Sequence, residues 1–166
     1  MHNAEIKRIY LDNSLLVGWF LPYLRETKNP NVPQIIDFLS NHKEIEVFVS
    51  HFSIAELMED LLFKEPRIRQ HMRKPDIILH YFETLTDIIN LKIITHIGKN
   101  GIEGNFVSKE IIDFTILCKQ PKDSIHVAIA KYQDLIFVTH DTKATILSKL
   151  YNNILTDNHL FKLFKI

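Results

Sequence analysis

Four short apolar segments, which alternate with longer amphipathic ones, constrain most strongly what this chain can fold into. Apolar, β-branched and aromatic residues dominate them, so we expect them to form strands. These segments are Ile6–Asp12, Ile45–Ser50, Lys92–His96 and Leu135–His140. The second and fourth are mostly apolar, as in strands covered on both faces. The sequence therefore predicts an α/β domain: a three-layer α-β-α arrangement with a central, mainly parallel twisted sheet of four to five strands.

Helices are expected in the segments between these strands. The clearest is Ser53–Phe63, where apolar residues recur at helical spacing. Further helices are expected at residues 14–26, bent or broken at Pro22, within residues 29–43, where Pro33 falls in the first turn of the helix after an initial turn, and at residues 75–91, 108–119, 123–132 and 142–151. The glycine-containing segment 98–105 is expected to form turns only. The tail, residues 159–166, is expected to be an edge strand or a docked end.

The composition favours one globular domain that spans residues 1–166. Hydrophobic residues make up 46% and charged residues 24% of the chain, which excludes a disordered protein. The single cysteine, Cys118, can form neither an internal disulfide nor a cysteine-based zinc site. The longest apolar run is too short to span a bilayer, and the first five residues lack the features of a signal peptide. A cytoplasmic protein is therefore expected.

The formal net charge is zero, which argues against a protein that simply coats nucleic acid. One segment is nevertheless strongly basic, because only Glu65 opposes five basic residues within it. These are Lys64, Arg67, Arg69, Arg73 and Lys74. The segment could be a solvated helix face or loop. Beside an acidic centre, it could instead bind the phosphate backbone of RNA.

Four acidic residues map to the edge of the sheet at which the strands end. Asp12 and Asp141 end the first and fourth expected strands, Glu56 lies one turn into a helix, and Asp123 begins another. Each has an ordinary structural explanation. Glu56 could complete a capping box with Ser53, and the three aspartates could cap the helices that follow them.

Together the four acids indicate a metal site, because ligands of open α/β sheets bind at this edge. Two ionised carboxylates about 5 Å apart repel each other by roughly 3 kcal/mol at an effective dielectric constant of about 20. Basic neighbours such as Lys122 and Lys143 could offset part of this repulsion, but Mg²⁺ or Mn²⁺ suits an all-oxygen site. Such clusters typically hydrolyse phosphodiesters by two-metal catalysis. Catalytic and metal-binding roles are therefore predicted for all four acids, with Thr139 as a supporting hydroxyl.

Four segments, in their order along the chain, resemble the motifs of the PIN-domain ribonucleases, a family that includes the VapC-type toxins. They read IYLDNSLL, SHFSIAELMEDL, KDSIHVAIA and FVTHD. The resemblance covers nearly the whole chain. It implies a parallel sheet between helices and a ribonuclease that uses Mg²⁺ or Mn²⁺.

The resemblance also carries residue roles. It places Asp12, Glu56, Asp123 and Asp141 at the family's acidic positions, and Ser14 and Thr139 at its supporting hydroxyl positions. It further implies RNA as substrate, a homodimer and an antitoxin protein as partner. The alternative left open is a PIN-fold module that binds RNA or a protein without cutting.

Overall fold

The sheet at the centre of the structure contains five strands, and all of them are parallel. The computed structural model describes residues 8–24, 34–64, 76–94 and 102–164. The strands lie in the order β3-β2-β1-β4-β5, so β1 is central. Their bounds are β1 (Arg8–Leu11), β2 (Glu46–Ser50), β3 (Leu91–Ile94), β4 (Ile136–Thr139) and β5 (Ile154–Thr156). The expected parallel sheet is confirmed.

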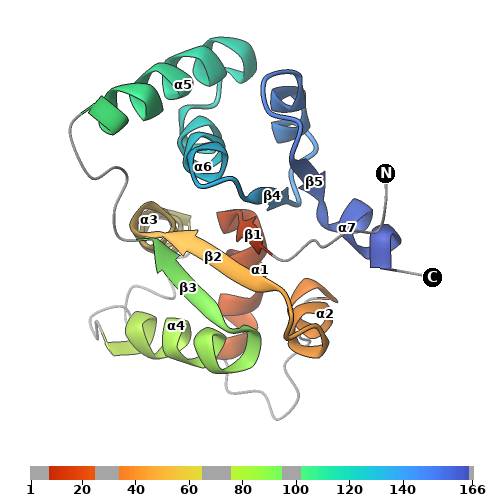
Figure 1. Cartoon of the computed structure of the whole chain (residues 1–166). Coiled ribbons are helices and arrows are strands. Elements are labelled where there is room, and N and C mark those ends of the chain that lie inside the picture. Colours follow the sequence, from red (N-terminus) through yellow and green to blue (C-terminus); the bar gives the residue numbers. More distant parts are fainter. Residues whose placement is uncertain (1–7, 25–33, 65–75, 95–101, 165–166) are drawn as a thin grey trace.

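Helices connect the strands and cover both faces of the sheet (Figure 1). Their bounds in the described part of the chain are α1 (Asn13–Leu24), α2 (Gln34–Asn41), α3 (His51–Lys64), α4 (Asp76–Ile89), α5 (Ile102–Cys118), α6 (Pro121–Tyr132), the 3-10 helix η1 (Ala144–Lys149) and α7 (Asp157–Phe164). Within these bounds, no helix is both long and apolar enough to cross a membrane.

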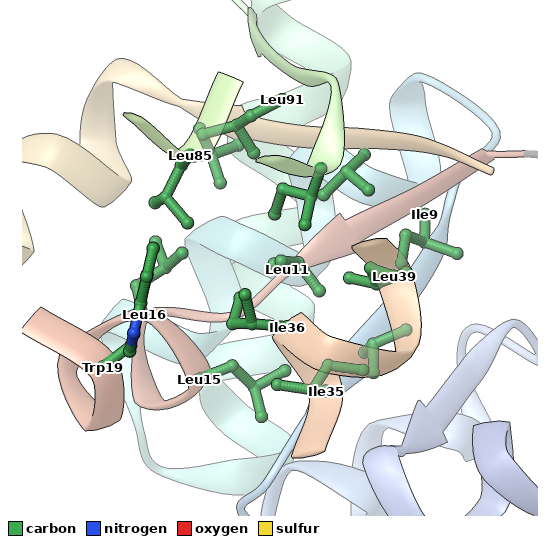
Figure 2. Close-up of a cluster of buried hydrophobic side chains, with 14 of the residues drawn as sticks. Ile9, Leu11, Leu15, Leu16, Trp19, Ile35, Ile36, Leu39, Leu85 and Leu91 are labelled. Atoms are coloured by element: carbon green, nitrogen blue, oxygen red, sulfur yellow. The ribbon is translucent and has the colours of Figure 1, made fainter. Parts of the chain in front are cut away.

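One face of the sheet buries aliphatic side chains against α1, α2, α4 and α7. Successive side chains of a strand point to opposite faces, and Ile9 and Leu11 of β1 both point to this one. Figure 2 shows Leu11 facing the same space as Ile36 and Leu39 of α2. We refer to these buried residues, which also include Leu16 and Trp19 of α1 and Leu160 of α7, as the first cluster.

The opposite face of the sheet packs against α5, α6 and η1. We refer to the buried side chains between them as the second cluster. Tyr10 and Phe137 point to it from the sheet, and Phe114, Val127 and Leu147 meet them from the three helices. Figure 1 shows α5 and α6 on the side of the sheet opposite α1, α2 and α4. Helices therefore cover both faces, and the expected three-layer α-β-α fold is confirmed.

The C-terminal part differs from the expectation. The fifth strand is β5, and the segment after it forms the helix α7 instead of an edge strand. The physical reason is the spacing of Leu160, Phe161 and Phe164, which lie on one helical face that packs against the first cluster. The edge-strand interpretation is therefore wrong, and the tail is a docked end over the described residues.

Helices α5, α1 and η1 also differ from the helices that the sequence predicts. Helix α5 begins at Ile102, so the expected turns at residues 102–105 are helical, while residues 98–101 lie outside the described part. Gly104 falls in the first turn of α5, where glycine costs less than in a helix interior. Helix α1 continues past Pro22 to Leu24 and is not broken there. The helix expected from Thr142 is the shorter 3-10 helix η1.

Candidate functional site

The strand order places a topological switch point between the carboxyl ends of β1 and β4. The chain leaves β1 toward β2 on one side, whereas β4 and β5 extend the sheet on the other side. Ligands of open α/β sheets bind at such a switch point. Asp12 directly follows β1, and its backbone N–H donates to the carbonyl of Val138 in β4 (2.9 Å). Asp141 lies two residues after the end of β4.

Asp12 is held in one orientation by three hydrogen bonds. Its Oδ2 accepts from Ser14 Oγ at 2.6 Å and from Thr139 Oγ1 at 2.8 Å, and its Oδ1 accepts from the backbone N–H of Asn13 at 2.8 Å. The side chain is almost completely buried, with 6% exposure. The two hydroxyl residues singled out in the sequence therefore both contact Asp12.

Asp141 is joined to the same group. Thr139 Oγ1 accepts from the backbone N–H of Asp141 (3.0 Å) while it donates to Asp12. Asp141 Oδ1 also accepts from the backbone N–H of Lys143 (2.7 Å), so the residue does cap the turn that precedes η1. This hydrogen bond engages only Oδ1, so capping and metal binding are compatible roles for Asp141.

Asp123 does not cap α6. The helix begins at Pro121, and the residue at the N-cap position is Gln120, which makes no side-chain capping hydrogen bond. Asp123 lies in the first turn, and its Oδ2 is buried with no hydrogen-bond partner among the described residues. The capping interpretation of Asp123 is therefore wrong, because the helix starts two residues earlier than expected.

The electrostatic environment of Asp123 brings the four acids together. Burial and, to a smaller extent, the negative charges of Asp12, Asp141 and Glu56 raise the pKa of its carboxyl from 3.8 to about 6, against an opposing influence of His126. The three other predicted acids thus lie near enough to Asp123 to disfavour its ionisation. All four predicted acids share one site.

Glu56 is free of the capping role that its position in the sequence suggested. Helix α3 begins at His51, and its capping box joins Ser50 and Ser53: the Ser53 N–H donates to Ser50 Oγ (3.4 Å), and the Ser50 N–H donates to Ser53 Oγ (3.2 Å). Glu56 Oε2 lies 2.7 Å from Nε2 of His126. Its Oε1 lies 4.0 Å from Nζ of Lys122.

His126 is the site residue that the sequence did not identify. It is fully buried one turn after Asp123 in α6, and its Nδ1 lies 2.8 Å from the Tyr10 hydroxyl. The available signal was this one-turn spacing, which places His126 and Asp123 on the same side of α6. The more exposed His140 pairs instead with Asp157, with 2.9 Å between His140 Nδ1 and Asp157 Oδ2.

The donor chemistry of the site fits a hard divalent cation. It offers carboxylate and hydroxyl oxygens without a thiolate, and the buried Asp123 Oδ2 has no protein donor among the described residues. As the side chains stand, no three Asp, Glu, His or Cys residues of the described ranges are arranged to hold a metal ion. Asp12 and Glu56 are instead engaged by protein hydrogen-bond partners.

The predicted RNA-binding segment falls almost entirely outside the described residues. Lys64 is the last residue of α3, whereas Arg67, Arg69, Arg73 and Lys74 lie in the range 65–75. The prediction for these five residues stays a prediction.

Comparison with known proteins supports the fold alone. No protein-family model matches the sequence, and no curated protein matches it significantly. Among solved structures, nine chains match significantly. One is the crystal structure of PAE2754 from Pyrobaculum aerophilum, which is similar with a TM-score of 0.54 and 17% sequence identity, over 98% of this chain and 93% of that chain. At this identity, the similarity shows a shared fold and nothing about activity.

Proposed function

We propose that this chain is a metal-dependent endoribonuclease that hydrolyses phosphodiester bonds of RNA. The proposed site consists of Asp12, Glu56, Asp123 and Asp141, with Mg²⁺ or Mn²⁺ as the cofactor. The observation that carries the proposal is the raised pKa of Asp123, to which the charges of the three other acids contribute. The negative charges of these acids therefore repel one another near the carboxyl ends of β1 and β4.

Repulsion of this kind needs an opposing positive charge. A pair of ionised carboxylates about 5 Å apart costs roughly 3 kcal/mol at an effective dielectric constant of about 20. Lys122 is placed to offset part of this cost at Glu56, but its Nζ lies closer to Glu59 Oε2 (2.7 Å) than to Glu56 Oε1 (4.0 Å). A divalent cation held by the four acids would offset the repulsion at all of them.

When bound, the cation would polarise a phosphodiester and lower the pKa of a bound water molecule. The residues of the chain would position these groups. Ser14 and Thr139 fix the Asp12 carboxylate through Oδ2, and Thr139 also orients the backbone of Asp141. The Asp12 carboxylate and the backbone of Asp141 are thus held in place at the ends of β1 and β4.

The choice of RNA and the wider role depend on the motif resemblance to the PIN-domain family. The proposal includes the role of a cytoplasmic VapC-like toxin in a toxin–antitoxin pair, with a homodimer and an antitoxin protein as partner. The basic segment from Lys64 to Lys74 supports an RNA ligand, because its five positive charges suit a phosphate backbone.

Cleavage of a mixed RNA pool tests the proposal. Wild-type protein is incubated with Mg²⁺, Mn²⁺ or EDTA, beside the variants Asp12→Asn and Asp87→Asn. Asp87 is an exposed aspartate on α4, which serves as the matched control. We expect wild type and the control to cleave only with metal. Asp12→Asn should lower the rate more than about a hundredfold, since loss of groups that merely support metal ligands already costs about 10–100-fold.

Two results would contradict the proposal. One is an absence of cleavage by pure wild-type protein across diverse RNAs with either metal. The other is equal cleavage by Asp12→Asn. A gel-shift assay on the same samples then identifies the alternative, since a non-cleaving RNA-binding module would shift RNA equally in wild type and in Asp12→Asn.

A further inference from the structure

A buried chain of polar side chains leads from the candidate site into the protein interior. It starts at Glu56 Oε2, passes through both ring nitrogens of His126, and reaches the Tyr10 hydroxyl, with distances of 2.7 and 2.8 Å. The Tyr10 oxygen also lies 2.7 Å from Ser50 Oγ and 3.1 Å from Ser53 Oγ. Tyr10, Ser53 and His126 have no exposed surface, so the sequestered chain cannot exchange partners with water.

The hydrogen-bond roles within this chain follow from its chemistry. Burial raises the pKa of Tyr10 far above its ordinary value, so the phenol keeps its proton. The ionised Glu56 carboxylate can only accept, so its contact with Nε2 requires a proton on Nε2. When His126 is neutral, Nδ1 then carries no proton and accepts from the Tyr10 O–H. When His126 is charged, Nε2 carries a proton as well. In both states an N–H group donates to the Glu56 carboxylate.

Two aromatic side chains also pack against the imidazole ring of His126. Its centroid lies 5.7 Å from that of Tyr10 and 5.0 Å from that of Phe52, both in tilted arrangements. The Tyr10 ring in turn stacks on Phe137 of β4 at 6.0 Å. Four elements, β1, β4, α3 and α6, thus fix the direction of the Nε2–H bond.

We propose that His126 is a positioning residue that aims Glu56 at the candidate metal centre. The inference rests on the proposed function and deepens it. Glu56 is a flexible side chain on a helix, whereas Asp12 is fixed by three donors at a strand end. The N–H group of His126 supplies Glu56 with the fixed donor that Ser14 and Thr139 supply to Asp12. Outer partners of this kind orient metal ligands in many proteins.

A purely structural histidine would hold α6 against the sheet without affecting Glu56. Two polar substitutions separate this role from positioning. In His126→Gln, the longer amide can reach Glu56 as Nε2 does, and in His126→Asn, the shorter amide can reach only toward Tyr10 as Nδ1 does. Both leave a polar group in the same buried place, so their effects on core packing are similar.

Mn²⁺ affinity, measured by titration calorimetry, is the first readout. We expect His126→Asn to weaken binding by about 10–100-fold and His126→Gln to stay within about threefold of wild type. In a Glu56→Gln background, His126→Asn should have no further effect, because its effect acts through Glu56. Equal affinities for the two His126 variants, or additive effects in the double variant, would overturn the inference. His80→Gln, at an exposed histidine on α4, is the control.

A second readout requires no metal, and its first part uses wild-type protein alone. Nitrogen-15 NMR of wild-type protein in EDTA should show a proton on Nε2 of His126, and a proton on Nδ1 alone would overturn the inference. The carboxyl carbon resonance of Glu56 should be the same in wild type and His126→Gln, and should move in His126→Asn. Wild-type protein that binds no Mn²⁺ and cleaves no RNA, yet gives these signals, would refute the proposed function and leave the positioning of Glu56 supported.

Discussion

At the scale of single residues, Asp123 determines how the site responds to pH. The carboxyl group is partly buried among three other acids, and its pKa rises to about 6. Below pH 4 it is protonated in the folded and the unfolded chain alike. Between about pH 4 and pH 6 the unfolded chain releases the proton while the folded chain retains it. The contribution of Asp123 to stability therefore falls as the pH rises from about 4 to about 6. Above pH 6 the folded chain also carries the charge, and the loss is complete.

The substitution Asp123→Asn should therefore stabilise the protein when metal is absent. In EDTA at pH 7.5, we expect the variant to exceed wild type by about 1 kcal/mol, or about 2–4 °C in melting temperature, after allowance for partial solvent screening. The difference should shrink toward pH 4. Thermal denaturation followed by circular dichroism at several pH values measures it. A less stable variant at pH 7.5 in EDTA would contradict this interpretation, and Asp87→Asn should show no such pH dependence.

At the scale of elements, the beginning of α3 determines where Glu56 lies. The reciprocal bonds of Ser50 and Ser53 fix the first turn of the helix, and both hydroxyls also contact Tyr10. Because the helix begins at His51, Glu56 lies more than one turn from its start and faces His126 instead of the helix end.

Ser50→Ala should cost about 1 kcal/mol of stability, the usual effect of removing a helix cap. Ser148→Ala, at an exposed serine in η1, should stay within about 0.5 kcal/mol of wild type. Urea denaturation of the two variants provides the measurement. Equal midpoints for both would mean that the reciprocal bonds of Ser50 and Ser53 contribute nothing to stability.

Elements with a strong local signal could be predicted from the sequence, and weakly marked ones could not. The strands β2 and β4 are mostly apolar and β-branched or aromatic, and both were expected within one residue at each end. Strand β5 has only three residues, too few to show a period. The edge-strand prediction for the tail was wrong for a related reason. Leu160, Phe161 and Phe164 fit a helical face, but a segment this short also fits a strand.

At the scale of the whole molecule, two apolar clusters share one sheet. Residues of the first cluster, such as Leu39, and of the second, such as Leu147, pack against opposite faces of the same strands. Loss of either cluster would leave the buried face of the sheet exposed to water. The two clusters should therefore unfold together in a single transition.

Trp19 makes this coupling measurable, since it is the one tryptophan of the chain and lies in the first cluster. We expect Leu39→Ala and Leu147→Ala each to cost about 2–5 kcal/mol. In both variants, Trp19 fluorescence and far-ultraviolet circular dichroism should report the same midpoint. Leu163→Ala, at a side chain with 47% exposure, should change little. Separate midpoints for the two signals in Leu147→Ala would show that the clusters unfold independently.

The candidate site could be predicted only in part, because its contacts join distant segments. The four acids and Thr139 could be predicted because the order of elements places each of them near a strand end or in the first two turns of a helix. The bond between Tyr10 and His126 spans 116 positions, and no local pattern indicates it. The predicted capping roles of Glu56 and Asp123 were wrong, because each depended on a helix start that lies two residues earlier than expected.

The central place of β1 also has a consequence for biosynthesis. Asp12 is translated well before its partner Thr139, which lies 127 positions later in the chain. Strand β1 therefore gains its neighbour β4, and Asp12 the residues that follow β4, only after residues up to Asp141 have been translated. A chain that stops before this point would lack the candidate site.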